Sequence, residues 1–343
     1  MFTKTTEMSL ERALFIRFGG LGDILLATPM VRALADSCPG IEIDFIVDKN
    51  MEEALTGNPY IRNVIAFDKR GPDMEPRHLL PFLARLARAR YDVVFNLNPS
   101  AKSFLMSAAA GTGCNITFCK RMGVRKDSGR VTHAIDDFAK ELRSLGFSKL
   151  RNRHMDFVTP ETARQRVALF MNEAGITDKD RLLVINPFAS RPLNRWPLGR
   201  FRAVAAHFAA RSGIKVVVTG ASWEMAGVQE VTSDDSRIIS VAGLITVKEL
   251  GALLLRANTL LTCDTGPMHI AAALQTPMVV LSGAADPDRT GPITAGATVL
   301  IDRTLPCVPC RQRTCGRGDV MCMQNLSVSA VIAAVEERLL AAP

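Results

Sequence analysis

The sequence has no long hydrophobic run. A membrane-spanning helix needs about eighteen or more consecutive apolar residues, and no segment of the 343 residues contains such a run. The first eleven residues, MFTKTTEMSLE, are polar and precede only a short apolar stretch. We therefore expect neither a secretory signal nor a membrane span, and we expect a cytoplasmic protein.

Aromatic residues are scarce, at 6% of the chain. The formal charge of +8 is densest at residues 117–131, TFCKRMGVRKDSGRV, where only Asp127 opposes the cations Lys120, Arg121, Arg125, Lys126 and Arg130. No aromatic side chain alternates with these cations to stack on bases, so nucleic acid is not an expected partner. The run is either a surface for another anionic partner or a solvated loop without a ligand.

The first glycine-rich turn lacks the dinucleotide-binding fingerprint. Gly19, Gly20 and Gly22 let the backbone turn sharply and let a ligand approach closely. A G-x-G-x-x-G motif beginning at Gly20 would require a glycine where the chain has Leu25. A nicotinamide-dependent oxidoreductase therefore loses its main support, and no set of residues for hydride transfer is evident.

The chain is long enough, and at 48% apolar residues hydrophobic enough, for two domains. Short β-rich runs alternate with helix-length segments, which is typical of βαβ units on a parallel sheet. The predicted strands lie at residues 12–18, 41–47, 63–67, 91–97, 114–118, 181–186, 214–219, 237–241, 258–263, 277–282 and 297–301. The predicted helices include residues 22–36, 78–90, 162–174, 198–211, 247–256, 267–274 and 327–341.

A polar stretch, SKLRNRHMDFVTPE at residues 148–161, interrupts this alternation and predicts a linker. We expect an α/β protein with two doubly wound, Rossmann-like domains, residues 1–158 and residues 159–343. Open parallel sheets bind ligands beyond the carboxyl ends of their strands. Two such sheets facing each other would form an interdomain cleft.

Asp23 is the first candidate functional residue. It follows the glycines in FGGLGDILLATP, residues 18–29, where a strand, a tight turn and a helix are expected. A carboxylate is favourable at the start of a helix, so Asp23 either only caps the helix or also acts as a functional residue. Pro29 is expected to interrupt or kink the helix that follows.

A second turn, Thr262–His269, resembles a phosphate site. Asp264 or Thr265 can cap the helix that follows, and Pro267 suits its first position. The unpaired amides and the positive end of the helix dipole then favour a phosphate, to which His269 can add a donor. The alternative is a capped helix with a buried histidine and no ligand.

Together these segments resemble glycosyltransferase family 9, which contains the ADP-heptose:lipopolysaccharide heptosyltransferases. The matching segments appear in family order along the chain: IRFGGLGDILLATP, NRWP at 194–197, GASWE at 220–224, DTGPMHIAAALQTP at 264–277 and DPDRTGP at 286–292. The resemblance implies a GT-B fold, with the first domain binding the acceptor and the second the nucleotide sugar. It also implies metal-independent, inverting transfer of heptose to a lipopolysaccharide inner core.

The resemblance also implies roles for individual residues. Asp23 matches the catalytic base, and Arg17, Gly20 and Gly22 fall at the acceptor side. The nucleotide sugar would meet Ser190 at its phosphates, Glu224 at its ribose hydroxyls, and Asp264, Thr265, Gly266 and His269 at its diphosphate. Trp196 is expected to pack rather than to react.

One departure from the family pattern concerns a lysine. Family members often carry it two residues before the Trp-Pro pair, and this chain has Asn194 there. The change removes a cation expected near the diphosphate. Arg191 or Arg195 is expected to substitute; if neither does, the donor's affinity or identity changes.

Four cysteines near the end of the chain follow the spacing C-x2-C-x4-C-x6-C: Cys307, Cys310, Cys315 and Cys322. This spacing is compatible with a structural zinc site, an iron–sulfur cluster or reduced thiols. Cys38, Cys114, Cys119 and Cys263 lie in or beside predicted core elements and behave as small hydrophobic residues. Without a signal peptide a disulfide framework is not expected.

The leading hypothesis is therefore a heptosyltransferase that uses an ADP-sugar donor and an anionic, lipid-linked saccharide acceptor. It would need no cofactor for transfer and would contact the inner face of the inner membrane transiently. Two alternatives remain: the same fold with another nucleotide sugar and glycan, and a catalytically silent nucleotide-sugar-binding protein.

Overall fold

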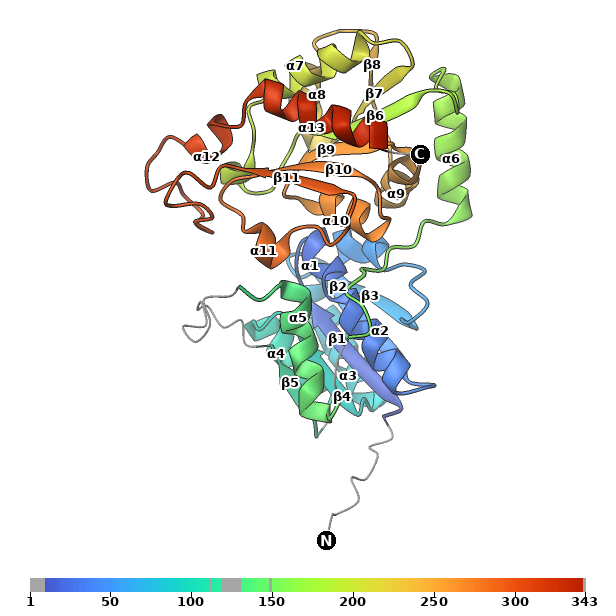
Figure 1. The fold of residues 1–343 in the computed structure, drawn as a ribbon. Coiled ribbons are helices and arrows are strands. Elements are labelled where there is room, and N and C mark those ends of the chain that lie inside the picture. Colours follow the sequence, from blue (N-terminus) through green and yellow to red (C-terminus); the bar gives the residue numbers. More distant parts are fainter. Residues whose placement is uncertain (1–9, 112, 119–130, 148–149, 342–343) are drawn as a thin grey trace. The chain divides into compact units, whose positions relative to one another are not determined.

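The computed structural model describes residues 10–111, 113–118, 131–147 and 150–341 (Figure 1). The chain forms two compact units, Met1–Arg153 and His154–Pro343. The division falls inside the stretch 148–161 that the sequence marks as a linker, five residues before the domain boundary expected at 158. Within the described residues, no helix is both long and apolar enough to cross a bilayer.

Unit 1 is built on a five-stranded parallel sheet in the order β3-β2-β1-β4-β5. Its strands are β1 (Arg12–Arg17), β2 (Glu42–Asp48), β3 (Asn63–Phe67), β4 (Val93–Asn96) and β5 (Asn115–Thr117). The central strand β1 is buried on both faces from Ala13 to Ile16, as a parallel strand covered by helices requires. In register with it, Phe45 of β2 and Phe95 of β4 stack on the two sides of Phe15, with ring centroids 5.6 and 4.7 Å away.

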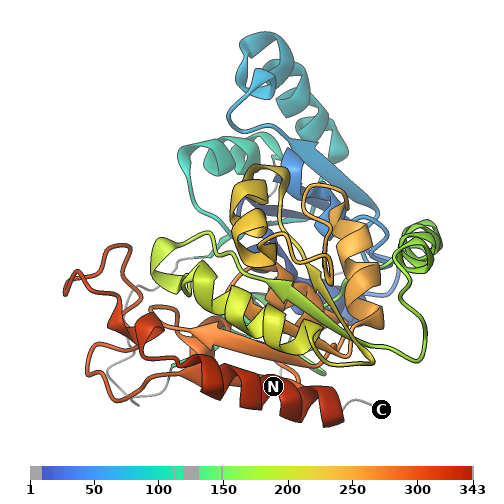
Figure 2. The ribbon, with the colours of Figure 1, turned by 90° about the horizontal axis from the view of Figure 1, so that it is seen from above.

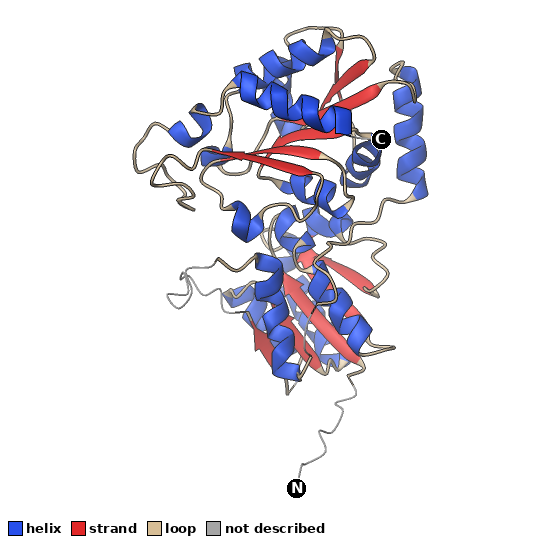
Figure 3. Cartoon of the chain, viewed as in Figure 1, coloured by secondary structure: helices blue, strands red, loops and turns tan. Residues whose placement is uncertain are grey.

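Helices cover both faces of this sheet (Figure 3). They are α1 (Leu21–Leu25), α2 (Thr28–Ser37), α3 (Pro76–Ala89), α4 (Ala101–Ala109) and α5 (Ala134–Ala139), with 3₁₀ turns η1 (Lys49–Ala54), η2 (Pro72–Met74) and η3 (Lys140–Leu145). Helix α3 packs on α4, and α2 packs on α5. Leu14 and Ile16 of β1 join Leu86 of α3 and Met106 of α4 in one core, because alternate residues of a strand point to the same face.

The predicted single helix 22–36 is two helices. α1 ends at Leu25 and α2 begins at Thr28, with Pro29 in the first turn of α2. Proline is tolerated there because the first amides of a helix have no partner within the helix. The expected interruption at Pro29 is therefore confirmed: the proline marks the start of a second helix and not a kink within one helix.

Unit 2 contains a six-stranded parallel sheet in the order β11-β10-β9-β6-β7-β8. Its strands are β6 (Arg181–Asn186), β7 (Ile214–Val218), β8 (Ile238–Ser240), β9 (Thr259–Cys263), β10 (Met278–Ser282) and β11 (Ala297–Ile301). Its helices are α6 (Glu161–Glu173), α7 (Leu198–Ala209), α8 (Met225–Thr232), α9 (Val247–Arg256), α10 (Gly266–Ala273), α11 (Pro287–Thr290), α12 (Met321–Gln324) and α13 (Val328–Ala341), with 3₁₀ turns η4 (Pro192–Asn194) and η5 (Ser222–Glu224).

The last helix, α13, packs against α7 and β10 of the same unit (Figure 2). Val331, Val335 and Leu339 are buried, and Val328 and Ile332 are partly buried beside them. The apolar stripe predicted at residues 327–341 is therefore confirmed.

Both sheets have the doubly wound strand order, in which the chain starts in the middle of the sheet and reverses direction once. The reversal lies between β1 and β4 in unit 1 and between β6 and β9 in unit 2. Such switch points open a crevice at the carboxyl ends of the two strands, where ligands of this fold class bind. The expected α/β class with two doubly wound domains is confirmed, and the switch points show where to look for a site in each unit.

Candidate functional site

Asp23 and Arg17 meet at the switch point of unit 1. Arg17 is the last residue of β1, and Asp23 lies in the first turn of α1. Nη2 of Arg17 donates to Oδ1 of Asp23 at 2.7 Å. The backbone amide of Gly20 donates to Oδ2 at 3.3 Å, which is at the long end for a hydrogen bond. The ion pair is thus the closer of the two contacts of this carboxylate.

Arg17 is itself held from two further sides. Its Nη1 donates to the carbonyl oxygen of Leu97, just after β4, and its Cζ lies 5.1 Å from the ring centroid of Phe138 in α5. Only 12% of the Arg17 side chain is exposed, against 51% of the Asp23 side chain. The cation is therefore fixed within the unit while the carboxylate is open to solvent. A carboxylate that only capped α1 would not need a buried arginine behind it.

The glycines before α1 have different roles. A Cβ on Gly19 would lie 2.6 Å from Cβ of Asp23 and 2.9 Å from its Oδ2, which is too close for any side chain. A Cβ on Gly20 would meet nothing within 4 Å, and Gly20 has an ordinary extended backbone with φ −73°. Gly19 therefore leaves room for Asp23, and Gly20 leaves open space beside it. Gly22 is buried within α1.

The corresponding switch point in unit 2 lies at the start of α10. Thr265 is the N-cap, but its side chain makes no capping hydrogen bond, and Pro267 is the second helical residue rather than the first. The expected capping by Asp264 or Thr265 is therefore not present. Pro267 has no amide hydrogen, and the amide of Met268 donates to the carbonyl of Thr265 at 3.2 Å, so within this turn it is the amide of Gly266 that suits an anion.

Asp264 precedes this helix in a water-poor environment. Burial raises its pKa to about 6, from an ordinary value of 3.8, and the positive charge of Arg191 acts in the opposite direction. His269, in the same helix, is buried. Thus Asp264 loses its charge at a pH close to neutral.

Four residues lie at or near the position where family members often carry a lysine: two bond to backbone groups, and two are exposed. Asn194 is buried, and its Oδ1 accepts a hydrogen bond from the amide of Ala285 at 3.1 Å. Nε of Arg195 donates to the carbonyl of Ala189 at 2.8 Å. Asn194 thus ties η4 to the loop after β10. Arg191 and Ser190 are exposed, and Arg191 is the cation whose charge reaches Asp264.

Glu224 ends the 3₁₀ turn η5 beyond β7. Its Oε2 accepts a hydrogen bond from the amide of Ala221 at 2.9 Å. Trp196 is buried, donates from Nε1 to the carbonyl of Leu326 at 3.0 Å and packs edge-to-face on Phe201. Trp196 is therefore a packing residue, as expected.

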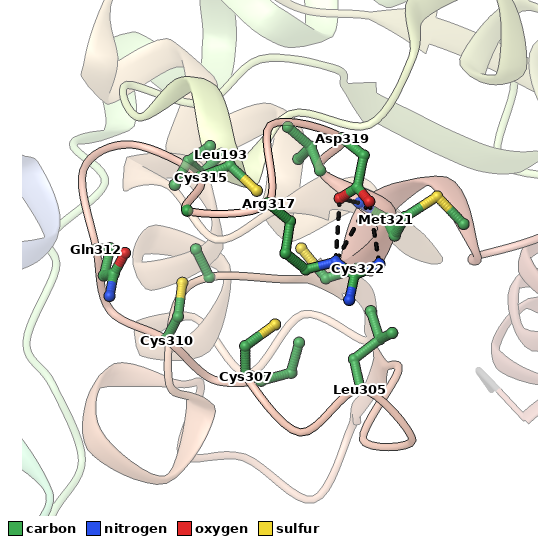
Figure 4. A pocket seen from close by; sticks show the side chains of 14 residues that line it. Leu193, Leu305, Cys307, Cys310, Gln312, Cys315, Arg317, Asp319, Met321 and Cys322 are labelled. Carbon is green, nitrogen blue, oxygen red and sulfur yellow. Dashed lines mark hydrogen bonds and ion pairs between the residues drawn. The ribbon is translucent and has the colours of Figure 1, made fainter.

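The four spaced cysteines line one cavity of about 120 Å³ in unit 2 (Figure 4). All four are free thiols: Cys307, Cys310, Cys315 and Cys322. Backbone amides of the surrounding loop, that of Val320 first, lower the pKa of Cys315, whereas burial raises the pKa of Cys322. Among the described residues, no three Cys, His, Asp or Glu side chains are placed to hold a metal ion.

The cysteine segment is anchored to the loop that Asn194 contacts. The amide of Arg311 donates to the carbonyl of Ala284 at 2.8 Å, and its guanidinium pairs with buried Asp286. Leu193 and Ala284, which line the cysteine cavity, are the chain neighbours of Asn194 and Ala285. The cavity and the switch point of unit 2 thus share the loop after β10.

Several features of the site had no signal in the sequence. Leu97 and Phe138, which hold Arg17, lie far from it in the chain, and Ala285 lies 91 residues from Asn194. That a side chain at Gly19 would collide with Asp23 could be suspected only because the two residues are close together in the motif. The basic residues from Lys120 to Arg130 lie outside the described residues.

The family model described as glycosyltransferase family 9 (heptosyltransferase) matches residues 80–321. The chain belongs to glycosyltransferase family 9. The matched range contains the candidate nucleotide residues of unit 2, whereas Arg17 and Asp23 precede it. The resemblance to this family that the sequence suggested is therefore confirmed, and its motifs from residue 194 to residue 292 lie inside the match.

Similar proteins extend the comparison over most of the chain. Lipopolysaccharide heptosyltransferase 3 of Escherichia coli K12 is 27% identical over 286 residues, 77% of this chain and 80% of that protein. Lipopolysaccharide heptosyltransferase 1 of Pseudomonas aeruginosa is 24% identical over 332 residues, 89% of this chain and 87% of that protein. Each comparison covers more of the chain than either unit contains, so both extend into both units.

Solved structures show the same fold. A family 9 glycosyltransferase from Veillonella parvula matches with a TM-score of 0.86 and 28% identity, over 98% of this chain and 99% of that one. The E. coli heptosyltransferase WaaC with ADP matches with a TM-score of 0.70 and 20% identity, over 95% and 99% of the two chains. The fold is GT-B, as the sequence predicted.

The raised pKa of Asp264 predicts a pH-dependent stability. A carboxyl whose pKa is higher in the folded state stabilises the fold below its unfolded value of 3.8, and this contribution is lost as the pH rises to about 6. Relative to an Asp264→Asn variant, we expect the wild type to lose about 3 kcal/mol of unfolding free energy across this range, and little above it. Urea titration followed by tryptophan fluorescence measures this, because both tryptophans, Trp196 and Trp223, lie in unit 2. A pH-independent difference would contradict it.

Proposed function

We propose that this family 9 protein transfers heptose from ADP-heptose to the Kdo/heptose inner core of lipopolysaccharide, with inversion and without a metal. The observation that carries the proposal is the exposed carboxylate of Asp23, paired with the largely shielded guanidinium of Arg17 at a doubly wound switch point. Family membership and the printed names of the relatives support the donor and acceptor classes.

The chemistry needs one carboxylate. In a single displacement, the acceptor hydroxyl oxygen attacks the anomeric carbon while its proton passes to Asp23. The bond from the anomeric carbon to the diphosphate oxygen breaks, and ADP leaves with its electron pair. Attack opposite the leaving group inverts the anomeric centre. In this proposal Arg17 orients Asp23, and a direct contact from Arg17 to the acceptor remains a prediction.

We assign the donor to unit 2. The backbone amides of Thr265 and Gly266 at the start of α10, with Arg191, would meet the diphosphate and stabilise the charge that develops on it. His269 and Ser190 would add donors, and Glu224 would hold the ribose hydroxyls. Arg191 takes the place of the missing lysine, while Asn194 and Arg195 shape the loop through Ala285 and Ala189.

We assign the acceptor to unit 1. The open space at Gly20, beside Asp23, allows a saccharide hydroxyl to approach closely, and the buried Gly22 lies next to Asp23 in α1. The acceptor would be an anionic, lipid-linked saccharide at the inner face of the inner membrane, reached from the cytoplasm.

Two alternatives predict other results. A related enzyme with a different donor would prefer UDP or GDP to ADP in competition binding. A catalytically silent protein would bind the nucleotide and turn over no donor. The pairing of Asp23 with a buried arginine favours an active base over the silent alternative.

The decisive variant is Asp23→Asn, which keeps the shape of the side chain and removes its basicity. With ADP-heptose and a panel of truncated core lipids, we expect the wild type to release ADP only with a heptose-deficient acceptor. In the variant we expect a loss of about 100-fold or more in turnover, with nearly unchanged ADP affinity. Retained turnover in Asp23→Asn would remove the assigned role.

We also propose that the cysteine cavity binds a structural zinc ion. Four thiols line one cavity, and thiolates are preferred ligands of zinc. Coordination would require the side chains to turn toward a common centre. The ion would then brace the loop after β10, through Ala284 and Ala285, and would take no part in transfer.

Metal analysis of the purified protein tests this proposal. We expect about one zinc ion per chain in the wild type, loss of zinc in a Cys307→Ser/Cys310→Ser variant, and retention in Cys38→Ser, a matched change outside the cavity. Background zinc in the wild type, or equal zinc in all three proteins, would contradict the site.

A further inference from the structure

Helix α4 presents its apolar side to solvent. Ala101, Phe104, Leu105 and Ala108 recur at helical spacing and are all exposed, with 50% of Phe104 and 44% of Leu105 accessible. A helix on a globular unit normally buries such a stripe and exposes its polar side. The reversed orientation of α4 therefore calls for a partner surface.

The inward side of α4 explains why this orientation is stable. Ser103 and Ser107 are buried, with Met106 between them. Oγ of Ser103 donates to the carbonyl of Asn98 at 2.8 Å, and Oγ of Ser107 donates to the carbonyl of Ser103 at 2.8 Å. Because backbone carbonyls satisfy both hydroxyls, burying them carries little penalty. The helix can therefore expose Phe104 and Leu105 while the hydroxyls of Ser103 and Ser107 stay hydrogen-bonded.

Helix α3 extends the same surface. It packs on α4, and its Leu80 is 64% exposed. Arg77, three residues before Leu80, and Arg88, eight residues after it, are also exposed and lie on the same face of α3. Arg77 pairs with Glu75, just before the helix, at 2.7 Å. The name α3–α4 surface is used below for Arg77, Leu80, Arg88, Phe104 and Leu105.

The charge of this surface restricts its partner. Within their bounds, α3 and α4 carry arginine, lysine and histidine and no Asp or Glu. A second copy docked through the same face would bring cations against cations. A suitable partner must accept apolar side chains and carry negative charge. The combination of phenylalanine and leucine with basic side chains is typical of helices that lie in the interface of an anionic membrane.

We infer that the α3–α4 surface docks unit 1 on an anionic lipid bilayer, with Leu80, Phe104 and Leu105 inserted below the headgroups and Arg77 and Arg88 at the phosphates. The inference rests on the proposed function, because a lipid-linked acceptor must be reached at a membrane. It assigns this contact to described residues of two packed helices, separate from the run at 117–131.

Vesicle sedimentation tests the docking directly. We compare the wild type, a Phe104→Ser/Leu105→Ser variant and a Leu169→Ser control; Leu169 is a 63% exposed leucine on α6 of unit 2. The probes are vesicles of phosphatidylcholine mixed with phosphatidylglycerol, and of phosphatidylcholine alone. We expect binding to the anionic vesicles that weakens with salt, and a loss of about tenfold or more in the double variant only. Unchanged thermal unfolding verifies that the exposed changes leave the fold intact.

A second measurement separates this inference from the proposed function. With a water-soluble, deacylated acceptor, we expect Phe104→Ser/Leu105→Ser to turn over ADP-heptose as the wild type does; with the acceptor embedded in vesicles, we expect its rate to fall. Equal vesicle binding by wild type and variant would overturn the docking surface, as would a change from dimer to monomer in the variant. Absence of turnover in the wild type with either acceptor would instead overturn the proposed function, while vesicle binding would still report on the surface.

Discussion

The ion pair between Arg17 and Asp23 is the interaction on which the account of unit 1 depends. A guanidinium that is largely shielded from water is destabilising unless polar groups of the protein compensate it. Arg17 is compensated from three sides: the carboxylate of Asp23, the carbonyl of Leu97 and the ring of Phe138. These partners come from α1, the end of β4 and α5, so the pair links the elements around the switch point. Asp23 is the exposed member and is the one that a ligand can reach.

The switch point of unit 2 has no comparable ion pair among the described residues; its features are an uncapped helix start and a carboxyl with a raised pKa. Its first-turn amides at α10 remain without a side-chain cap, and the nearby carboxyl of Asp264 is buried enough to have its pKa raised to about 6. A carboxyl that is easily neutralised, next to helix amides and within the field of Arg191, opposes an incoming anion less than an ordinary aspartate would. The two units thus differ in their charge chemistry, in keeping with the different roles that we propose for them: a base in unit 1 and an anion site in unit 2.

Sequence patterns predicted the sheets well and the site in part. Strands 63–67, 181–186 and 297–301 have the predicted bounds, because each reads as a short apolar run between turn signals, whether it is buried like β6 or lies at a sheet edge like β3 and β11. Helix α4 was not predicted, since its apolar residues face solvent and its serines face the core. The motifs brought Asp23, Glu224 and Asp264 to attention. They could not show that Asn194 is tied to Ala285, or that Leu97 and Phe138 hold Arg17, because these contacts form only when distant parts of the chain fold together.

The central claim is that Arg17 holds Asp23 in position to accept a proton. The most direct test is the steady-state kinetics of an Arg17→Gln variant, which removes the cation and retains a hydrogen-bond donor. We expect kcat to fall by about tenfold or more, with little change in the KM for ADP-heptose. Unchanged kcat with a raised KM for the acceptor would contradict the claim and would make Arg17 an acceptor-binding residue instead.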